Sequence, residues 1–102
     1  MEKLDIILKA LDDKIAENVV SIDLKGKSSI AEYFVIATGS AVNHNQAICD
    51  EIEFQLKKNN MDCLSTEGYK DGNWILLDCG EIVVHIMTKD YRSYYNFERL
   101  WA

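Results

Sequence analysis

Two short hydrophobic runs near the end of the chain alternate like the strands of a hairpin around a Cys79-Gly80 turn. Successive side chains of a strand point to opposite faces of its sheet. One predicted face collects Ile75, Leu77, Ile82, Val84 and Ile86. The other face collects Trp74, Leu76, Val83, His85 and Met87. A two-residue turn at Cys79-Gly80 further predicts that Trp74 lies opposite His85.

Both faces of this predicted hairpin are apolar, whereas a hairpin with one face in water alternates apolar with polar residues. Two arrangements satisfy the pattern. Either helices cover both faces of the sheet, or one face is an exposed apolar surface. The choice between them bears directly on function.

Hydrophobic spacing predicts two long helices, over residues 3–15 and 42–58. The predicted inner face of the second helix holds Ala41, Ile48, Ile52 and Leu56. Strands are predicted at residues 19–24, 33–38 and about 63–66, and a loop with a short helix at 90–99.

The resulting order, α-β-β-α-β-β-β-(α), predicts an α/β fold with a mixed sheet of about five strands. We expect a single domain over residues 1–102, because no linker or repeat interrupts the chain. Two helices cannot cover both faces of such a sheet. If both pack on one face, the other face stays partly bare at the hairpin. This favours an exposed surface that contains Trp74, Leu76, His85 and Met87.

Composition excludes several classes of protein. The chain has 102 residues, of which 48% are hydrophobic, so it has enough apolar side chains for one core and too many for disorder. The beginning of the chain lacks the basic flank of a signal peptide, and no run approaches the roughly 20 apolar residues of a membrane span. Three cysteines without CxxC spacing argue against a disulfide framework or a zinc site. Reduced thiols in a cytoplasmic protein are the simplest interpretation.

The net charge of −6 gives no general attraction for nucleic acid, whose phosphates are neutralised by Lys and Arg. A basic protein partner suits this charge better. The charge also has a simpler interpretation, which is that it only aids solubility. Composition alone leaves both open.

One candidate enzymatic motif is Gly39-Ser40, which resembles the opening of the nucleotidyltransferase motif. Such enzymes place two metal-binding acids on a strand, where alternate residues share a face. The matching pair here, Glu51 and Glu53, lies within a predicted helix, where residues two apart diverge. We therefore predict no transferase site, and expect Gly39 to form a tight turn and Ser40 or Asn43 to cap the helix.

Other polar residues give no stronger signal of chemistry. Asp78 and Glu81 fit solvation of the hairpin turn, and His44 and His85 have no ligand-spaced neighbours. His85 is expected to pack on Trp74 at the sheet surface. We expect no metal and no cofactor. Cys79 is the most reactive-looking thiol, yet nothing beside it in the sequence lowers its pKa.

An aromatic cluster ends the chain, comprising Tyr91, Tyr94, Tyr95, Phe97 and Trp101. It either closes the core, which we favour for Phe97 and Leu100, or forms a binding patch, because Tyr, Trp and Arg are enriched at binding hot spots. Arg92 and Tyr94 remain open between these interpretations.

Several separated blocks together resemble the ribosomal silencing factor family, also called Iojap-like proteins. They read YFVIATGS at 33–40, QAI at 46–48, EGY at 67–69, WILLD at 74–78, VVH at 83–85 and YNFERLW at 95–101. The resemblance covers nearly the whole chain. It weakens at the beginning and around residues 57–66.

The resemblance implies a nucleotidyltransferase-like fold without the catalytic acids. It also implies binding to the large ribosomal subunit through its ribosomal protein number fourteen. Binding then blocks subunit joining by steric exclusion and represses translation when nutrients are scarce. The residues predicted to contact the partner are Tyr69, Trp74, Leu76, His85, Met87, Arg92 and Tyr94. The alternatives are an active nucleotidyltransferase and a homo-oligomeric scaffold, such as a homodimer, that buries the same patch.

Overall fold

The computed structural model describes residues 2–27, 29 and 31–95. Its elements are α1 (Glu2–Asp13), β1 (Glu17–Asp23), β2 (Tyr33–Gly39), α2 (Val42–Lys58), β3 (Ser65–Glu67), β4 (Trp74–Asp78), β5 (Ile82–Thr88) and α3 (Lys89–Tyr94). The predicted order is confirmed. The predicted core residues Phe97 and Leu100, and Trp101, lie outside the described residues.

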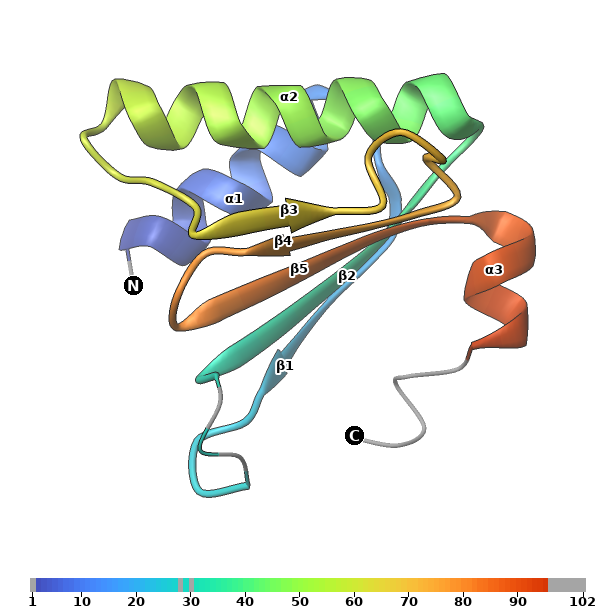
Figure 1. Cartoon of the computed structure of the whole chain (residues 1–102). Coiled ribbons are helices and arrows are strands. Elements are labelled where there is room, and N and C mark those ends of the chain that lie inside the picture. Colours follow the sequence, from blue (N-terminus) through green and yellow to red (C-terminus); the bar gives the residue numbers. More distant parts are fainter. Residues whose placement is uncertain (1, 28, 30, 96–102) are drawn as a thin grey trace.

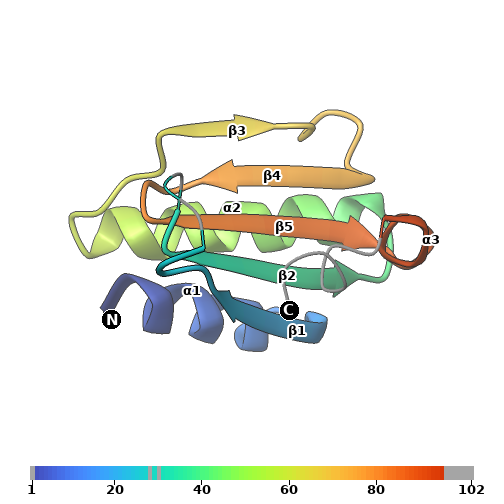
Figure 2. The same ribbon diagram turned by 90° about the horizontal axis from the view of Figure 1, so that it is seen from below.

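The five strands form one sheet in the order β1-β2-β5-β4-β3 (Figures 1 and 2). Strands β2 and β5 are parallel, and every other neighbouring pair is antiparallel. Two parallel strands must be joined by a crossover connection, which usually contains a helix. Helix α2 lies in the connection between β2 and β5, so these two strands can run parallel at the centre of the sheet. The predicted mixed α/β sheet is therefore confirmed.

Helices α1 and α2 lie side by side on one face of the sheet, as Figure 1 shows. In α1 the residues that face the sheet are fully buried, namely Ile7, Ala10 and Leu11. In α2 the buried apolar residues follow a four-residue spacing, with Ile48, Ile52 and Leu56 facing inward. Ala41 does not belong to this inner face as predicted, because it precedes the helix as its N-cap and is exposed.

The hairpin of β4 and β5 keeps its predicted faces but not its predicted register. Trp74 pairs with Met87, and Leu76 pairs with His85, so the prediction that Trp74 lies opposite His85 is wrong. The turn lies one residue later than predicted, because Cys79 still bonds across the hairpin through its N–H to Ile82 O at 2.8 Å. Gly80, with a φ of +84°, supplies the left-handed conformation of this turn. A shift by two positions leaves each side chain on the same face.

The second face of the sheet, shown toward the viewer in Figure 2, carries a smaller apolar cluster. Its buried members are Ile22, Leu24, Ala31, Ile36, Val83 and Met87. Leu24 and Ala31 come from the connection between β1 and β2, and Tyr91 of α3 packs against the same cluster. These segments cover part of the face that the sequence predicts to be bare.

The coverage changes two predictions. Met87 is fully buried and His85 is only 4% exposed, so neither belongs to an exposed surface as predicted. Trp74 and Leu76 are half-buried. Among the helices that the structure describes, none is long and apolar enough to cross a membrane.

Candidate protein-binding surface

Three rings from three strands meet on the second face of the sheet. The Trp74 indole N–H donates a hydrogen bond to His85 Nδ1 at 3.2 Å, which confirms that His85 packs on Trp74. Phe34 of β2 packs on the other side, with its ring centroid 5.1 Å from that of His85 in an edge-on arrangement. Because an indole N–H only donates, Nδ1 is the accepting nitrogen, and neutral His85 carries its proton on Nε2.

His85 remains neutral near physiological pH. Burial disfavours the charged imidazolium and lowers the pKa of His85 to about 4. The lone pair on Nδ1 is therefore available to Trp74 at pH 7. The prediction that His85 lies at the surface is wrong. His85 lies beneath the Trp74 indole, and the hydrogen bond between them sets the position of the indole.

Helix α3 extends this row of rings toward solvent. The Tyr95 ring centroid lies 5.0 Å from Trp74, 5.9 Å from Tyr91 and 4.8 Å from Tyr94. The exposed fractions are 81% for Tyr94 and 40% for Tyr95. We call the set Phe34, Trp74, Leu76, Tyr91, Tyr94 and Tyr95 the aromatic surface.

Arg92 holds α3 against the end of β2. Its Nη1 donates to Thr38 Oγ1 at 2.9 Å, and Thr38 is only 4% exposed. Thr38 pairs with Met87 in the parallel register, so this contact lies on the same face as the aromatic surface. Arg92 thus places a half-buried positive charge at the margin of that surface.

Tyr69 lies apart from the other predicted contact residues. Its hydroxyl donates to the Asp50 carboxylate of α2 at 2.9 and 3.0 Å, and its carbonyl accepts from Gln46 Nε2 at 2.8 Å. Helix α2 covers one face of the sheet (Figure 1), and Trp74 packs against the cluster on the other face. The bond to Asp50 raises the pKa of Tyr69. The seven predicted contact residues therefore do not form one continuous surface.

Sequence reasoning did not assign Phe34 to this surface and left Tyr91 and Tyr95 unplaced. The alternation of side chains along β2 could have placed Phe34 on the same face of the sheet as Ile36. In the observed register Phe34 pairs with Val83 and Ile36 pairs with His85. The parallel pairing of β2 with β5 could not be deduced from the alternation of either strand alone.

The carboxylates considered for catalysis are engaged separately. Glu51 accepts from Gln55 Nε2 at 2.8 Å, whereas Glu53 accepts from Thr66 Oγ1 at 3.2 Å. Both lie on α2, where residues two apart point in different directions. In the part of the chain that the structure describes, no group of three or more His, Cys, Asp or Glu residues is arranged to hold a metal ion.

The two acids of the hairpin turn have local partners. Asp78 accepts from the Gly80 N–H at 3.0 Å. Glu81 pairs with Lys3 Nζ at 2.9 Å, and this bond lowers the pKa of Glu81. Lys3 also donates to Cys79 O at 2.9 Å, so Lys3 secures the hairpin turn to α1, whereas Asp78 stabilises the turn itself.

The turn from β2 into α2 differs from the prediction. No side chain caps α2 at Ala41, so Ser40 and Asn43 are not its N-cap. Gly39 is needed because a Cβ there would collide with the Asn45 side chain, and its φ is not left-handed. His44 Nδ1 accepts from the Ser40 N–H at 2.8 Å, and His44 Nε2 lies 2.7 Å from Lys14 O. Ser40 Oγ also lies 3.0 Å from His44 Nδ1, so the His44 ring ties Ser40, just before α2, to the segment that follows α1.

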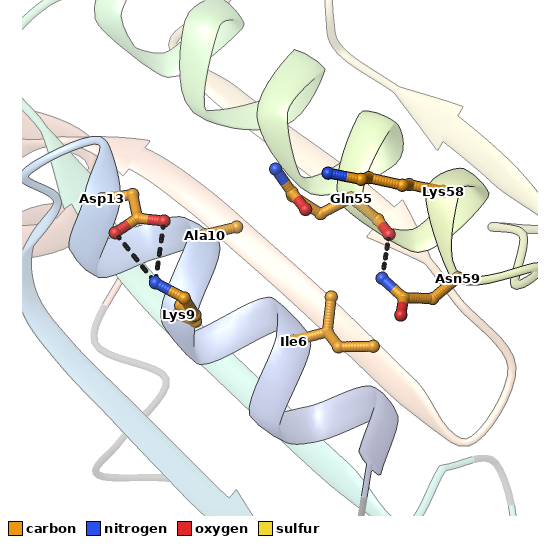
Figure 3. A pocket seen from close by; sticks show the side chains of 7 residues that line it. All are labelled: Ile6, Lys9, Ala10, Asp13, Gln55, Lys58 and Asn59. Atoms are coloured by element: carbon orange, nitrogen blue, oxygen red, sulfur yellow. Dashed lines mark hydrogen bonds and ion pairs between the residues drawn. The ribbon is translucent and has the colours of Figure 1, made fainter.

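A cavity of about 400 Å³ lies between α1 and α2 (Figure 3). It is lined by Ile6, Lys9, Ala10, Asp13, Gln55, Lys58 and Asn59. Lys9 pairs with Asp13 at 3.4 Å, and Asn59 Nδ2 donates to Gln55 O at 2.8 Å. This cavity lies on the helix-covered side, away from the aromatic surface, and its lining contains neither His nor Cys.

The whole chain, residues 1–102, matches the family model described as "Ribosomal silencing factor during starvation". It is 43% identical to the ribosomal silencing factor of Bacillus subtilis, over 97% of this chain and 84% of that protein. A crystal structure of a Chromobacterium violaceum protein is similar with a TM-score of 0.95 and 30% identity, over 98% of this chain and 83% of that chain.

A more distant mouse relative is named "Mitochondrial assembly of ribosomal large subunit protein 1", with 26% identity over 97% of this chain and 45% of that protein. The match to the family model extends over every described element and over the residues that carry the predicted resemblance. The chain belongs to the family of ribosomal silencing factors, whose name denotes regulation of translation.

Proposed function

We propose that this protein binds the large ribosomal subunit through its ribosomal protein number fourteen and sterically blocks joining of the small subunit. Translation is thereby repressed under nutrient limitation. The protein acts in the cytoplasm and performs no chemical step. Trp74, Leu76 and Tyr94 contact the partner, and Arg92 contributes at the margin. His85 and Met87 support this surface from beneath.

The observation that carries this proposal is the aromatic surface itself. Tyr and Trp are enriched at protein interfaces because they combine a large apolar area with few rotatable bonds and a polar group. Here Tyr94 is 81% exposed and packs on Tyr95, which packs on Trp74. The His85 hydrogen bond holds the indole in one orientation, which reduces the entropy lost on binding.

Charge supports a protein as the direct partner. The chain carries −6, which disfavours attachment to ribosomal RNA through phosphates and favours a basic protein. The printed name of the mouse relative concerns the large subunit of a ribosome, which supports the large subunit as the target. Tyr69 is on the other side of the sheet, and we do not assign it to this contact.

The engaged carboxylates support a mechanism by occlusion. Glu51 and Glu53 have separate partners and diverge on α2, so they do not form a two-metal centre. A protein that occupies the joining face of one subunit needs only affinity and bulk to inhibit.

The test combines sedimentation and subunit joining. Purified protein is mixed with separated small subunits, separated large subunits and intact ribosomes, and each mixture is sedimented. We expect co-sedimentation with large subunits alone, and reduced formation of intact ribosomes when small subunits are added afterwards. Binding to small subunits, or binding to large subunits without an effect on joining, would contradict the proposal.

A further inference from the structure

A cavity of about 290 Å³ lies against α3, at the outer end of the aromatic surface. It is lined by Asp90, Tyr91, Tyr94 and Tyr95, and we call this set the α3 cage. The four residues occupy positions i, i+1, i+4 and i+5, so they share one side of the helix and its C-cap. Figure 2 shows α3 at the end of β5, so the cage lies at one end of the sheet.

The three tyrosine rings supply the walls of the cage. The ring planes of Tyr94 and Tyr95 are inclined by 68°, with their centroids 4.8 Å apart. The ring of Tyr91 is inclined by 39° to that of Tyr95, at 5.9 Å. The face of an aromatic ring is negative and attracts a cation that lies within about 6 Å of its centroid. Because all three rings line one cavity, a cation inside it interacts with more than one ring.

The charge of the cage has the same sign as the ring faces. Among the described residues that line the cavity, Asp90 alone is charged. Its side chain is exposed, and it forms no ion pair within the described part of the chain. The neighbouring cations are directed elsewhere, since Lys89 lines an adjacent hollow and Arg92 donates to Thr38.

These features decide which class of ligand the cage accepts. An anion is repelled both by the Asp90 carboxylate and by the ring faces. A neutral apolar group would cover the carboxylate without giving it a hydrogen bond, which costs free energy. A cation with an apolar stem satisfies the carboxylate and the rings together.

We propose that the α3 cage binds the side chain of an arginine from the basic partner protein. The inference rests on the proposed function and adds the chemistry of one contact to it. A guanidinium is planar, so it stacks on a tyrosine ring while its N–H groups donate to the Asp90 carboxylate. A lysine ammonium is a more strongly hydrated point charge and fits such a site less well. Since Tyr95 packs on Trp74 at 5.0 Å, the bound arginine fixes the position of the partner along the aromatic surface.

The first test needs only this protein. The NMR signals of the tyrosine rings are followed as N-acetylarginine amide is added, and N-acetylcitrulline amide serves as a probe of similar shape without the charge. We expect the signals of Tyr94 and Tyr95 to shift with the arginine probe and to shift far less with the citrulline probe. Asp90→Asn should remove most of the difference. Equal shifts with the two probes, or no shift with arginine, would overturn the inference.

The second test measures co-sedimentation of variants with large subunits. Asp90→Asn should weaken binding by roughly 10-fold or more, because a charged hydrogen bond is lost. Tyr94→Leu should weaken it by about 2- to 30-fold, although leucine is apolar, because the ring face is lost. Tyr94→Phe keeps the ring and should bind within about 2-fold of the unaltered protein.

Asp12→Asn is the matched control for charge. Asp12 is exposed and lies on α1, which covers the other face of the sheet. This variant loses the same charge away from the cage, so its affinity should be unaltered. An equal loss for Asp12→Asn and Asp90→Asn would mean that only the net charge matters, which would overturn the inference.

The outcomes separate this inference from the proposed function. If the unaltered protein binds large subunits, and neither Asp90→Asn nor Tyr94→Leu weakens binding, the cage is not used and the proposed function stands. If the unaltered protein does not bind large subunits, the proposed function is wrong, and the NMR titration alone decides whether the cage accepts arginine. Self-association that Asp90→Asn abolishes would identify a second copy of the chain as the occupant and would overturn the inference. Circular dichroism checks the fold of every variant.

Discussion

The indole N–H of Trp74 and the imidazole Nδ1 of His85 form a 3.2 Å hydrogen bond between neighbouring strands, although the two residues are not paired in register. Trp74 pairs with Met87 and reaches His85 diagonally. Diagonal neighbours on one face of a sheet are within reach of aromatic side chains. The bond fixes the half-buried indole against which Tyr95 packs, and Tyr94 packs edge-on against Tyr95.

The first prediction concerns affinity for the large subunit. Replacing a hot-spot aromatic residue by Ala costs about 2–4 kcal/mol of binding, or roughly 30- to 1000-fold. We expect a loss in this range for Trp74→Ala and a smaller loss for Tyr94→Ala. The measurement is co-sedimentation of a titration series with purified large subunits.

Phe54 provides a matched control for this experiment. It is 60% exposed and lies on α2, which covers the other face of the sheet. Phe54→Ala should bind like the unaltered protein. Circular dichroism checks the fold of each variant. Folded Trp74→Ala with unaltered affinity, or Phe54→Ala with a greater loss than Tyr94→Ala, would place the interface elsewhere.

The second prediction is a dependence of stability on pH that originates at His85. Its pKa falls from 6.5 in the unfolded chain to about 4 in the folded protein. Between these values the unfolded state binds more protons, so the free energy of unfolding decreases as the pH falls. A difference of about 2.5 pKa units at 1.36 kcal/mol each gives roughly 3 kcal/mol, present above pH 6.5 and lost by pH 4.

His85→Asn isolates this contribution, because an amide oxygen replaces Nδ1 as an acceptor for Trp74 and does not titrate. Urea unfolding at several pH values gives the free energy of unfolding for both proteins. We expect the difference between them to change by roughly 3 kcal/mol between pH 7 and pH 4. Parallel curves across this interval would mean that His85 is protonated at similar pH in both states.

The burial of His85 could not be predicted from its own strand. The alternation of β5 places it on the correct face, yet alternation does not reveal what covers that face. The cover comes from Leu24 and Ala31, in a connection with no regular pattern, and from the packing of Tyr91. The turn register failed for a related reason, since Cys79 and Gly80 both fit a turn, and only the tertiary burial of Cys79 decides between them.

Tyr69 shows the same limit. The sequence places Tyr69 shortly before the hairpin. Its position in the fold, however, depends on three hydrogen bonds between the β3–β4 loop and α2. Asn45 donates to Gly72 O, Gln46 donates to Tyr69 O, and Asp50 accepts from the Tyr69 hydroxyl. Such side-chain contacts between distant segments leave no periodic trace in the sequence. The helices and the two faces of the hairpin do leave a periodic pattern in the sequence, and both were predicted.

The third prediction separates core residues from surface residues. Ile75 and Ile36 are both fully buried, in the two clusters on opposite faces of the sheet. Ile75→Ala and Ile36→Ala should each cost about 2–5 kcal/mol of stability through lost burial and the cavity left behind. Tyr94→Ala should change stability by less than about 0.5 kcal/mol, as is usual for exposed positions.

Thermal unfolding measures all three variants under one condition. At the size of this domain, the two core substitutions should lower the melting temperature by roughly 10 °C or more, leaving Tyr94→Ala nearly unaltered. A melting temperature that fell more for Tyr94→Ala than for Ile36→Ala would mean that the covered and exposed sides of the second face are assigned backwards.

The last prediction is that inhibition of subunit joining requires neither Glu51 nor Glu53 as a metal ligand. Two-metal chemistry needs carboxylates that converge on ions about 3.5–4 Å apart. On a helix with 3.6 residues per turn, positions two apart diverge by about 200°. Convergence would require unwinding α2, which carries Ile52 into the core.

The test is the double substitution Glu51→Gln with Glu53→Gln, since a glutamine can still accept the bonds from Gln55 and Thr66. We expect inhibition of subunit joining to persist, with a small change in affinity from the lost surface charge. Treating the protein with EDTA before it meets magnesium-containing ribosomes should also leave inhibition unchanged. A double variant that is folded and bound to the large subunit, yet no longer inhibits joining, would restore a chemical role for these carboxylates. Occlusion alone would then be insufficient as a mechanism, because the bound protein would still fill the same space.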